Sequence, residues 1–338
     1  MVEGGLVEVS IHVDTTQRGR LGEQWRRAKT EAELNPLRAE FAPMIRAAEE
    51  TTGRTLRAAT TMTVTRDNLD SVTDVVRWLT EHTDAFRLIS FQPIAQVGRT
   101  GEGCGGGVDV DALWDRVADG LGLPGGAERT KRMGVWFGHE ACNRMVNGFV
   151  AQRRGAAPAF HALRDADADI DVRAVDGFLA RFGGVSFRLD NKRAMIARAI
   201  GLLRTAPLFC AGILPPFAVH WLRRIGDGGA WRGLWRLLSG ESKTTSLVLV
   251  SHHFMSKDEL ESPLGKQRLA HCVFRVPING QMLSMCAVNA LGIRERYCEA
   301  LNASANGAIS GATTGAVAAL DASYVDAVTT ATRRVQSA

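Results

Sequence analysis

Along the first hundred residues, segments with the hydrophobic pattern of β-strands are followed in turn by segments with the hydrophobic pattern of helices. Residues 6–14 (LVEVSIHVD) alternate apolar and polar side chains, and residues 56–65 and 86–94 are rich in β-branched or aromatic residues, so each predicts a strand. Residues 37–51 and 69–82 have the apolar spacing of helices. We therefore expect a β-α-β-α-β series, which predicts a parallel sheet with right-handed crossovers.

Polar residues stand at the ends of these predicted strands. Ligands of parallel α/β sheets bind at the carboxyl ends of the strands, so these residues predict a site at that edge. Threonine is also an ordinary strand former, and the two interpretations carry equal weight. Asp67 or Asn68 is expected to cap the helix that follows the second strand. The polar strand-end residues are His12, Asp14, Thr15, Thr63, Thr65 and Gln92.

The β-α-β-α-β pattern ends at the stretch that follows the third predicted strand. A glycine-rich stretch at 98–107 has no Gly-Lys-Ser/Thr sequence, which argues against a phosphate-binding loop and favours a connection; it contains Cys104. A helix is expected at 109–120, and residues 190–239 are basic, tryptophan-bearing and helical in pattern. Residues 245–254 predict another strand, and the Asn-Gly turn in residues 271–288 predicts a β-hairpin.

Composition places the chain among ordinary globular proteins. Hydrophobic residues make up 45% and charged residues 23%, which allows a sizeable core. The net charge of +5 is mild and dispersed, so a nucleic-acid partner is not expected. Neither a signal peptide nor a spanning helix is expected, because the longest apolar run, 208–222, is interrupted by Pro215 and Pro216.

The six cysteines offer the sharpest candidate chemistry. Without an export signal, disulfides are not expected, which leaves buried free thiols or metal ligands. Cys272 and Cys286 lie on either side of the hairpin turn, which would bring their thiols together. Cys142 is the natural third ligand, and a histidine, a carboxylate, Cys210, Cys298 or an exogenous ligand is left open as the fourth.

Three segments resemble a known family. VSIHVDTTQRG, TMTVTRDNLDSVTDVVRWL and FRLISFQPIAQVGRT resemble the later strands of the barrel in radical S-adenosylmethionine (radical SAM) enzymes. The segment HHFMSKDELESPLGKQRLAHCVFRVPINGQMLSMCAVNALGIRERY resembles the C-terminal region of radical SAM proteins related to tetraether lipid synthases. The resemblance implies an α/β fold: a partial (βα) radical-SAM-type barrel with the later strands only, then a mostly helical C-terminal region with a cysteine-bearing β-hairpin.

The same resemblance implies cofactors and ligands. Cys142, Cys272 and Cys286 match the expected ligands of an auxiliary [4Fe–4S] cluster, and Ser10 and Asn68 lie where related enzymes contact S-adenosylmethionine. The full-length parent would use a 5′-deoxyadenosyl radical on an unactivated C–H bond, with a lipid as the suggested substrate and a reductant protein as a partner. It would be cytoplasmic, with a peripheral membrane association through the basic, tryptophan-bearing helices.

The sequence departs from the family at the radical-generating cluster. No Cys-x3-Cys-x2-Cys occurs in the chain, so we expect it to be inactive alone. A truncated gene, a start codon assigned too far downstream, or an enzyme split between two polypeptides would each explain this departure. The expected regions are a partial barrel at 1–125, an auxiliary-cluster and substrate region at 126–300, and a weakly structured tail at 301–338. The rival hypothesis is a non-catalytic module that binds zinc or an iron–sulfur cluster, or a protein partner.

Overall fold

The structure is a computed structural model that describes residue 2 and residues 4–17, 22–97, 107–183, 192–278 and 280–306. The chain divides into two compact units. Unit 1 comprises Met1–Phe91, Asp109–Val135 and Met145–Ser251, and unit 2 comprises Gln92–Val108, Trp136–Arg144 and His252–Ala338. The segments of the two units thus alternate along the chain.

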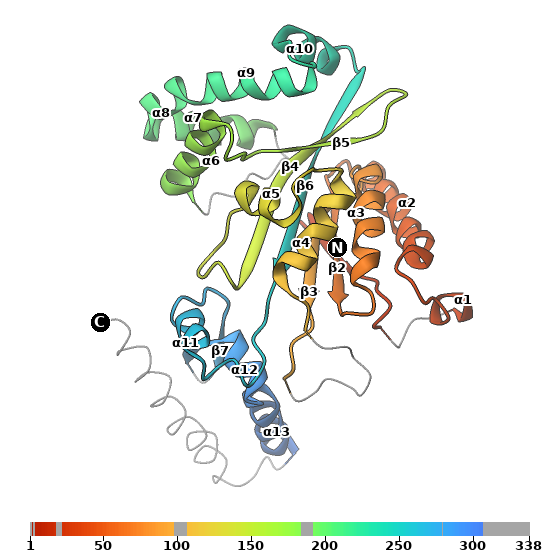
Figure 1. Cartoon of the computed structure of the whole chain (residues 1–338), viewed down its shortest axis with the longest axis vertical. Helices are drawn as coiled ribbons and strands as arrows, with labels where there is room; N and C mark the ends of the chain where they lie inside the picture. Colours follow the sequence, from red (N-terminus) through yellow and green to blue (C-terminus); the bar gives the residue numbers. More distant parts are fainter. Residues whose placement is uncertain are drawn as a thin grey trace. The chain divides into compact units, whose positions relative to one another are not determined.

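Unit 1 is built on a mainly parallel six-stranded sheet (Figure 1). The strand order is β1-β2-β3-β6-β4-β5. β1 pairs with β2 in parallel, β3 pairs with β6 in parallel, and β4 pairs with β5 antiparallel. The strands are β1 (Glu8–His12), β2 (Arg57–Val64), β3 (Phe86–Pro93), β4 (Asn143–Arg153), β5 (Ala159–Ala162) and β6 (Ser242–His252).

The first three strands and their connecting helices confirm the predicted β-α-β-α-β series. Between β1 and β2 lie α1 (Glu23–Arg26), a 3-10 turn and α2 (Asn35–Thr52), and α3 (Val72–Glu81) joins β2 to β3. The predicted cap is confirmed in position but not in its hydrogen bond. Asn68 precedes the 3-10 turn Leu69–Ser71, but its side chain makes no capping bond, because it is engaged by other groups at the strand ends.

The core of unit 1 lies between the sheet and its helices. Helix α4 (Val110–Leu121) begins at Asp109, whose carboxylate accepts the backbone N–H groups of Asp111 and Ala112. Trp114 of α4 is fully buried and donates its indole N–H to the Ser251 hydroxyl, 2.9 Å away. Helix α3 packs directly on α4 at Gly120, where a Cβ atom would come within 2.6 Å of the Val76 Cβ.

The expectation of a mostly helical region after residue 125 is only partly right. The helices there are present, and β6 was predicted, but β4 and β5 were missed, and these three strands complete the six-stranded sheet. The helices of this part of unit 1 are α5 (Gly126–Met133), α6 (Asp169–Phe182), α7 (Lys192–Thr205), α8 (Pro207–Gly212), α9 (Leu214–Ile225) and α10 (Ala230–Leu238).

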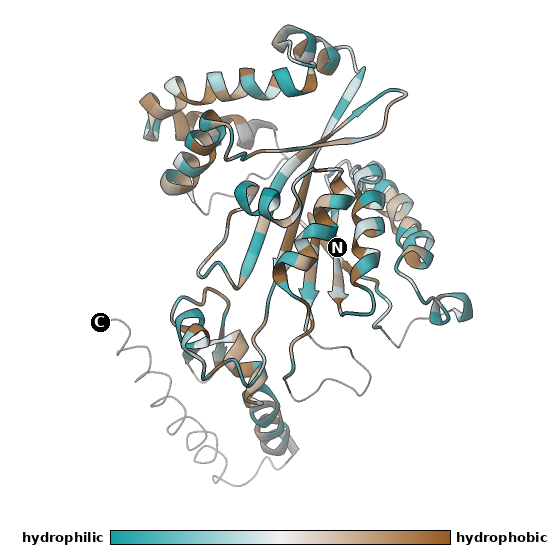
Figure 2. Ribbon diagram, viewed as in Figure 1, coloured by the Kyte–Doolittle hydropathy of each residue, from teal (hydrophilic) through white to brown (hydrophobic). Residues whose placement is uncertain are grey.

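Helices α8 and α9 carry the longest apolar run, and hydrophobic residues predominate along α8 and the first part of α9 (Figure 2). Among the described residues, no single helix is long and apolar enough to cross a membrane. The segments Ile196–Thr205 and Pro207–Ile225 reach the required length and composition only as a pair bent by 107°.

Unit 2 contains the predicted hairpin in a shorter form. Strands β7 (Arg275–Ile278) and β8 (Gln281–Ser284) pair antiparallel, and Gly280 in the turn has a φ of 76°, which suits glycine. Asn279 lies outside the described residues, as do the stretch 98–106 with Cys104 and the tail from 307. The helices of this unit are α11 (Pro263–Ala270), α12 (Met285–Ala290) and α13 (Ile293–Asn306).

Candidate metal site

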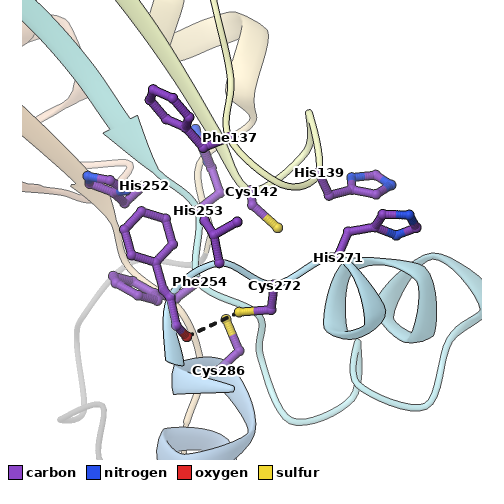
Figure 3. Close-up of a pocket in the computed structure, with 11 residues that line it drawn as sticks. Phe137, His139, Cys142, His252, His253, Phe254, His271, Cys272 and Cys286 are labelled. Atoms are coloured by element: carbon purple, nitrogen blue, oxygen red, sulfur yellow. Dashed lines mark hydrogen bonds between the residues drawn. The ribbon is translucent and has the colours of Figure 1, made fainter. Parts of the chain in front are cut away.

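A pocket within unit 2 collects sulfur and imidazole groups from four segments of the chain. We call it the sulfur pocket. The side chains of its three cysteines turn toward the same space (Figure 3). Its lining residues are Cys142, Cys272, Cys286, His139, His252, His253, His271, Phe137, Phe254, Val273 and Phe274. The structure therefore brings together all three cysteines that the sequence predicts as metal ligands.

Each cysteine is positioned by a different local structure. Cys142 ends a tight turn in which its N–H donates to the His139 carbonyl at 2.9 Å. Cys272 follows α11, and its N–H donates to the Leu269 carbonyl at 3.2 Å. Cys286 is not on the hairpin itself, as the sequence suggested, but in the first turn of α12, directly after β8. The hairpin still brings the two thiols to one pocket, because both flank its open end.

The Cys142 turn is held against the end of α11 by a close backbone contact. Gly138 has a φ of 72°, and a Cβ atom at this position would lie 2.3 Å from the His271 carbonyl oxygen. Only glycine suits both the left-handed backbone and this approach. A second bond fixes the other side of the turn, where the His253 N–H donates to the Cys142 carbonyl at 2.8 Å.

Two polar groups donate hydrogen bonds to the sulfur atoms. The Nε of Arg268 lies 3.4 Å from the Sγ of Cys142, and Arg268 is only 4% exposed. The same guanidinium donates to the His253 carbonyl and reaches Glu259. The hydroxyl of Ser284 donates to the Sγ of Cys272 at 3.3 Å. Donors of this kind stabilise negative charge on sulfur, which is the state in which a cysteine binds a metal.

Cys286 is the most enclosed of the three thiols. It packs with Met255, Leu260 and Ala290 in a small apolar cluster. Burial raises the pKa of the Cys286 thiol. Cys272, by contrast, donates its thiol hydrogen to the Phe274 carbonyl at 3.2 Å. Both thiols must lose a proton when a metal binds.

The pocket is small in this structure. Its volume is about 20 Å³, which accommodates a single atom or ion. Among the described residues, no three His, Cys, Asp or Glu side chains are arranged to hold a metal ion as they stand. Loading the sulfur pocket would therefore require its side chains to move, and a cluster would require more movement than a single ion. The type of donor set, three thiols with imidazoles nearby, fits zinc and iron–sulfur centres equally.

The remaining described cysteines lie elsewhere. Cys210 is buried against Phe182 and Phe209 in unit 1, and its thiol donates to the Leu202 carbonyl. Cys298 is exposed on α13 and does not line the sulfur pocket. Cys210 and Cys298, two of the candidates left open for a fourth ligand, therefore do not line the pocket. Four histidines do line it.

The two residues predicted to contact S-adenosylmethionine lie in unit 1. Ser10 is exposed on β1. Asn68 is buried, and its amide is engaged on both sides: its oxygen accepts the Thr65 N–H at 2.8 Å, and its nitrogen donates to the Thr63 carbonyl at 2.9 Å. In this structure the Asn68 side chain organises the strand end, and a ligand would have to displace these bonds.

Sequence reasoning missed a buried ionic network at the carboxyl ends of β1 and β2. We call it the Asp14–Glu31 network; it comprises His12, Asp14, Glu31, Arg38 and Asn68. Asp14, Glu31 and Arg38 are each at most 1% exposed. Arg38 donates to Glu31 and to the Val13 carbonyl, and Glu31 also accepts the N–H and hydroxyl of Thr15. The strand-end pattern pointed to Asp14, but Glu31 and Arg38 resemble ordinary surface residues in the sequence.

The buried carboxylate of Asp14 is kept in its charged form by hydrogen bonds within this network. Burial alone would raise the pKa of Asp14, but hydrogen bonds from His12, Thr16 and Thr63 outweigh it and lower the pKa to about 2. The same bond to Asp14 raises the pKa of the half-exposed His12 imidazole. Since each Asp14 oxygen is supplied with donors from its own chain, the network serves first to hold the strand ends.

Unit 1 also contains an apolar cavity of about 250 Å³. Its walls come from α6, α9 and β4 with their neighbours, and include Phe178, Leu214 and Phe217. The polar residues among its lining are Asn147 and Arg164, and Arg164 is held by a two-pronged ion pair with Asp176. An apolar cavity of this size exceeds the space that a benzene molecule needs.

Comparison with known proteins adds no identification: no family model matches the sequence, and no curated protein matches it.

Proposed function

We propose that unit 2 binds an auxiliary iron–sulfur cluster through Cys142, Cys272 and Cys286, and that the chain is part of a radical SAM enzyme. One observation carries the first half of the proposal: three cysteines, more than a hundred residues apart at the extremes, line one pocket. Cysteine thiolates on separate, fixed segments are the usual ligands of such clusters. When bound, the cluster supplies one-electron chemistry.

The rest of the proposal rests on the family resemblance and on the first half of unit 1. The β1–β3 series with its crossover helices is what the later strands of a radical SAM barrel would require. Under this proposal S-adenosylmethionine would meet Ser10 and Asn68, and a reductant protein would deliver the electron. The reaction proposed for the whole enzyme is attack of a 5′-deoxyadenosyl radical on an unactivated C–H bond.

The chain's own residues prepare the sulfur pocket for an anionic centre. Arg268 places a buried positive charge beside Cys142, and Ser284 directs a hydroxyl at Cys272. Phe137, Phe254 and Phe274 also line the pocket and add apolar surface to its wall. Both features tune the reduction potential of a bound cluster.

Metal analysis tests this proposal. Chain purified without oxygen and supplied with iron and sulfide should bind about four of each per chain. Cys142→Ser, Cys272→Ser and Cys286→Ser should each lose most of both. Cys210→Ser and Cys298→Ser are matched controls that should retain them, because neither residue lines the pocket. Full iron and sulfide content in the Cys272→Ser, Cys286→Ser double variant would overturn the assignment.

A single zinc ion is the second candidate, and the size of the pocket favours it. A volume of about 20 Å³ suits one ion, and zinc commonly takes three thiolates with one imidazole. In that case the protein would be a structural metal-binding or partner-binding module rather than part of an enzyme. The zinc site would be supported if protein expressed in metal-rich medium contained one zinc ion per chain and no sulfide.

We also propose that α10 contacts a lipid surface. Trp231, Trp235 and Leu238 recur on one face of this helix and are 83%, 69% and 75% exposed. Arg223 and Arg232 are exposed on α9 and α10, which suits anionic headgroups. The apolar cavity of unit 1, walled partly by α9, offers space for part of a hydrocarbon substrate.

Vesicle co-sedimentation tests the lipid proposal. The chain should bind vesicles that contain anionic phospholipid, and the Trp231→Ala, Trp235→Ala double variant should bind at least tenfold more weakly. Trp136→Ala, which removes another exposed tryptophan in unit 2, is the control and should bind as the parent does. Equal binding by the double variant would refute the role of α10.

A further inference from the structure

The three thiols of the sulfur pocket leave a tetrahedral centre one ligand short. Iron–sulfur and zinc centres alike usually take four protein ligands, and imidazole nitrogen is an acceptable partner for both metals. Four histidines line the pocket, so the choice among them decides what completes the site.

The hydrogen bond of His271 fixes which of its nitrogens is available. Its Nδ1 lies 2.9 Å from the Gln267 carbonyl oxygen. A carbonyl can only accept, so Nδ1 carries the hydrogen and the lone pair of the neutral ring lies on Nε2. A ring nitrogen that donates to a backbone carbonyl while the other binds metal is the common arrangement of metal-bound histidine.

The backbone of His271 is also held beside the other ligands. It follows the last residue of α11 and immediately precedes Cys272. The Gly138 contact presses the Cys142 turn against the His271 carbonyl. His271 is thus tied to two of the three thiol-bearing segments, one by sequence and one by packing.

Two other imidazoles of the pocket are engaged in ways that suit a ligand less well. The Nδ1 of His139 accepts the Ala141 N–H at 3.1 Å, so its remaining nitrogen carries the hydrogen in the neutral ring. The His252 ring packs edge-on against the Phe274 ring at 5.0 Å. His139 and His271 lie on the same side of the pocket, with ring centres 6.2 Å apart, which makes His139 the sharpest control (Figure 3).

We infer that the Nε2 atom of His271 is the fourth ligand of the metal centre, with Cys142, Cys272 and Cys286 as the other three. The inference rests on the proposed iron–sulfur site and extends it to a mixed sulfur and nitrogen ligand set. Replacing one anionic thiolate by a neutral imidazole makes the bound cluster less negative, which raises its reduction potential.

Pulsed electron paramagnetic resonance on the reduced, reconstituted chain tests the ligand directly. The parent chain should show a nitrogen coupling from a directly bound imidazole, which changes on labelling histidine with ¹⁵N. His271→Ala should lose this coupling while keeping most of its iron. His271→Cys should keep iron and sulfide, lose the coupling and titrate at a more negative potential. His139→Ala and His253→Ala should retain the parent spectrum.

The outcomes separate this inference from the proposal beneath it. Two outcomes would overturn only the assignment of His271 as the fourth ligand. In the first, the chain binds iron and sulfide through the three cysteines but shows no histidine coupling; in the second, the coupling persists in His271→Ala. Loss of the coupling in His139→Ala or His253→Ala instead of His271→Ala overturns it as well. A chain that takes up no iron, or only zinc, overturns the cluster and with it this ligand.

Discussion

The Asp14–Glu31 network of unit 1 and the sulfur pocket of unit 2 both gather polar groups inside the protein, but they satisfy them differently. In the network, each carboxylate accepts short hydrogen bonds from its own chain, such as that from Thr16 to Asp14 at 2.6 Å. In the pocket, Arg268 directs one side-chain donor at Cys142, 3.4 Å away, and Ser284 directs one at Cys272, 3.3 Å away; both are ordinary lengths for bonds to sulfur, but they are fewer donors than the Asp14 carboxylate accepts. The difference separates a group of residues that completes itself from one suited to an added ligand.

The largest expected effect comes from removing the cation of the network. Arg38→Met leaves the fully buried Glu31 carboxylate without its ion-pair partner, while it keeps much of the side-chain volume. Breaking such a pair on one side costs about 3–5 kcal/mol. We expect a loss of this size in the free energy of unfolding from urea titration monitored by circular dichroism.

An exposed ion pair provides the control for this change. Arg77 pairs with Asp74 on the surface of α3, and both side chains are more than half exposed. Arg77→Met should lower the free energy of unfolding by less than about 1 kcal/mol. Equal losses in the two variants would show that the network does not hold unit 1 together.

The second effect tests whether the sulfur pocket depends on its close backbone contact. Gly138→Ala must adopt a left-handed backbone and force a Cβ atom against the His271 carbonyl, which together cost roughly 2–4 kcal/mol. We expect the Cys142 turn to separate from α11, and iron retention after a chelator challenge to fall.

Gly155→Ala isolates the backbone contribution. Gly155 has a φ of 77°, but nothing lies within 4 Å of its added Cβ, so only about 1–2 kcal/mol of strain is expected. Its iron retention should match that of the parent. A chelator-resistant Gly138→Ala protein would show that the contact does not organise the pocket.

Local pattern was sufficient to predict most elements of the sheet. Each of the first three predicted strands lies within about two residues of its observed bounds, because alternating side chains face a helix layer on one side. The insertion of β6 between β3 and β4 was not predictable in this way. It depends on pairing between residues more than 150 positions apart, such as Leu88 and Val248, and no local spacing encodes such a pairing.

The candidate site was predictable to a similar degree. The hairpin turn placed Cys272 and Cys286 together, and the need for a third ligand pointed to Cys142, which the family resemblance then supported; the structure brings all three to one pocket. Arg268 was not foreseen, because a basic residue on a short helix usually faces solvent, whereas this one is buried beside sulfur. Glu31 and Arg38 were not predicted either, because charged residues usually face solvent, whereas these two are buried.

The third effect concerns how the network responds to pH. The pKa of Asp14 is about 2 when folded and close to 4 when unfolded, so the carboxylate stabilises the fold above pH 4 and loses this contribution as the pH falls through 2. The difference in unfolding free energy between the parent and Asp14→Asn should therefore shrink by about 2 kcal/mol from pH 5 to pH 2.

His12 extends the same test to higher pH. Its pKa is raised by the bond to Asp14, so its contribution is complete below about pH 6.5 and is lost as the pH rises through the raised value. The His12–Asp14 pair should thus stabilise the protein most between about pH 4 and 6.5. A parent-to-variant difference that stays constant from pH 2 to 8 would contradict this account of the pair.

The smallest effect separates a hydrogen bond that tunes a metal centre from one that only stabilises the fold. Ser284→Ala removes the hydroxyl that donates to Cys272, and Ser251→Ala removes the hydroxyl that accepts from Trp114 in unit 1. Each change should lower the unfolding free energy by about 0.5–1.5 kcal/mol. Only Ser284→Ala should shift the reduction potential of the reconstituted cluster to a more negative value, because one donor to its sulfur ligands is lost. Equal potentials in the two variants would mean that Cys272 is not bound to the cluster, and the sulfur pocket would then resemble the network after all.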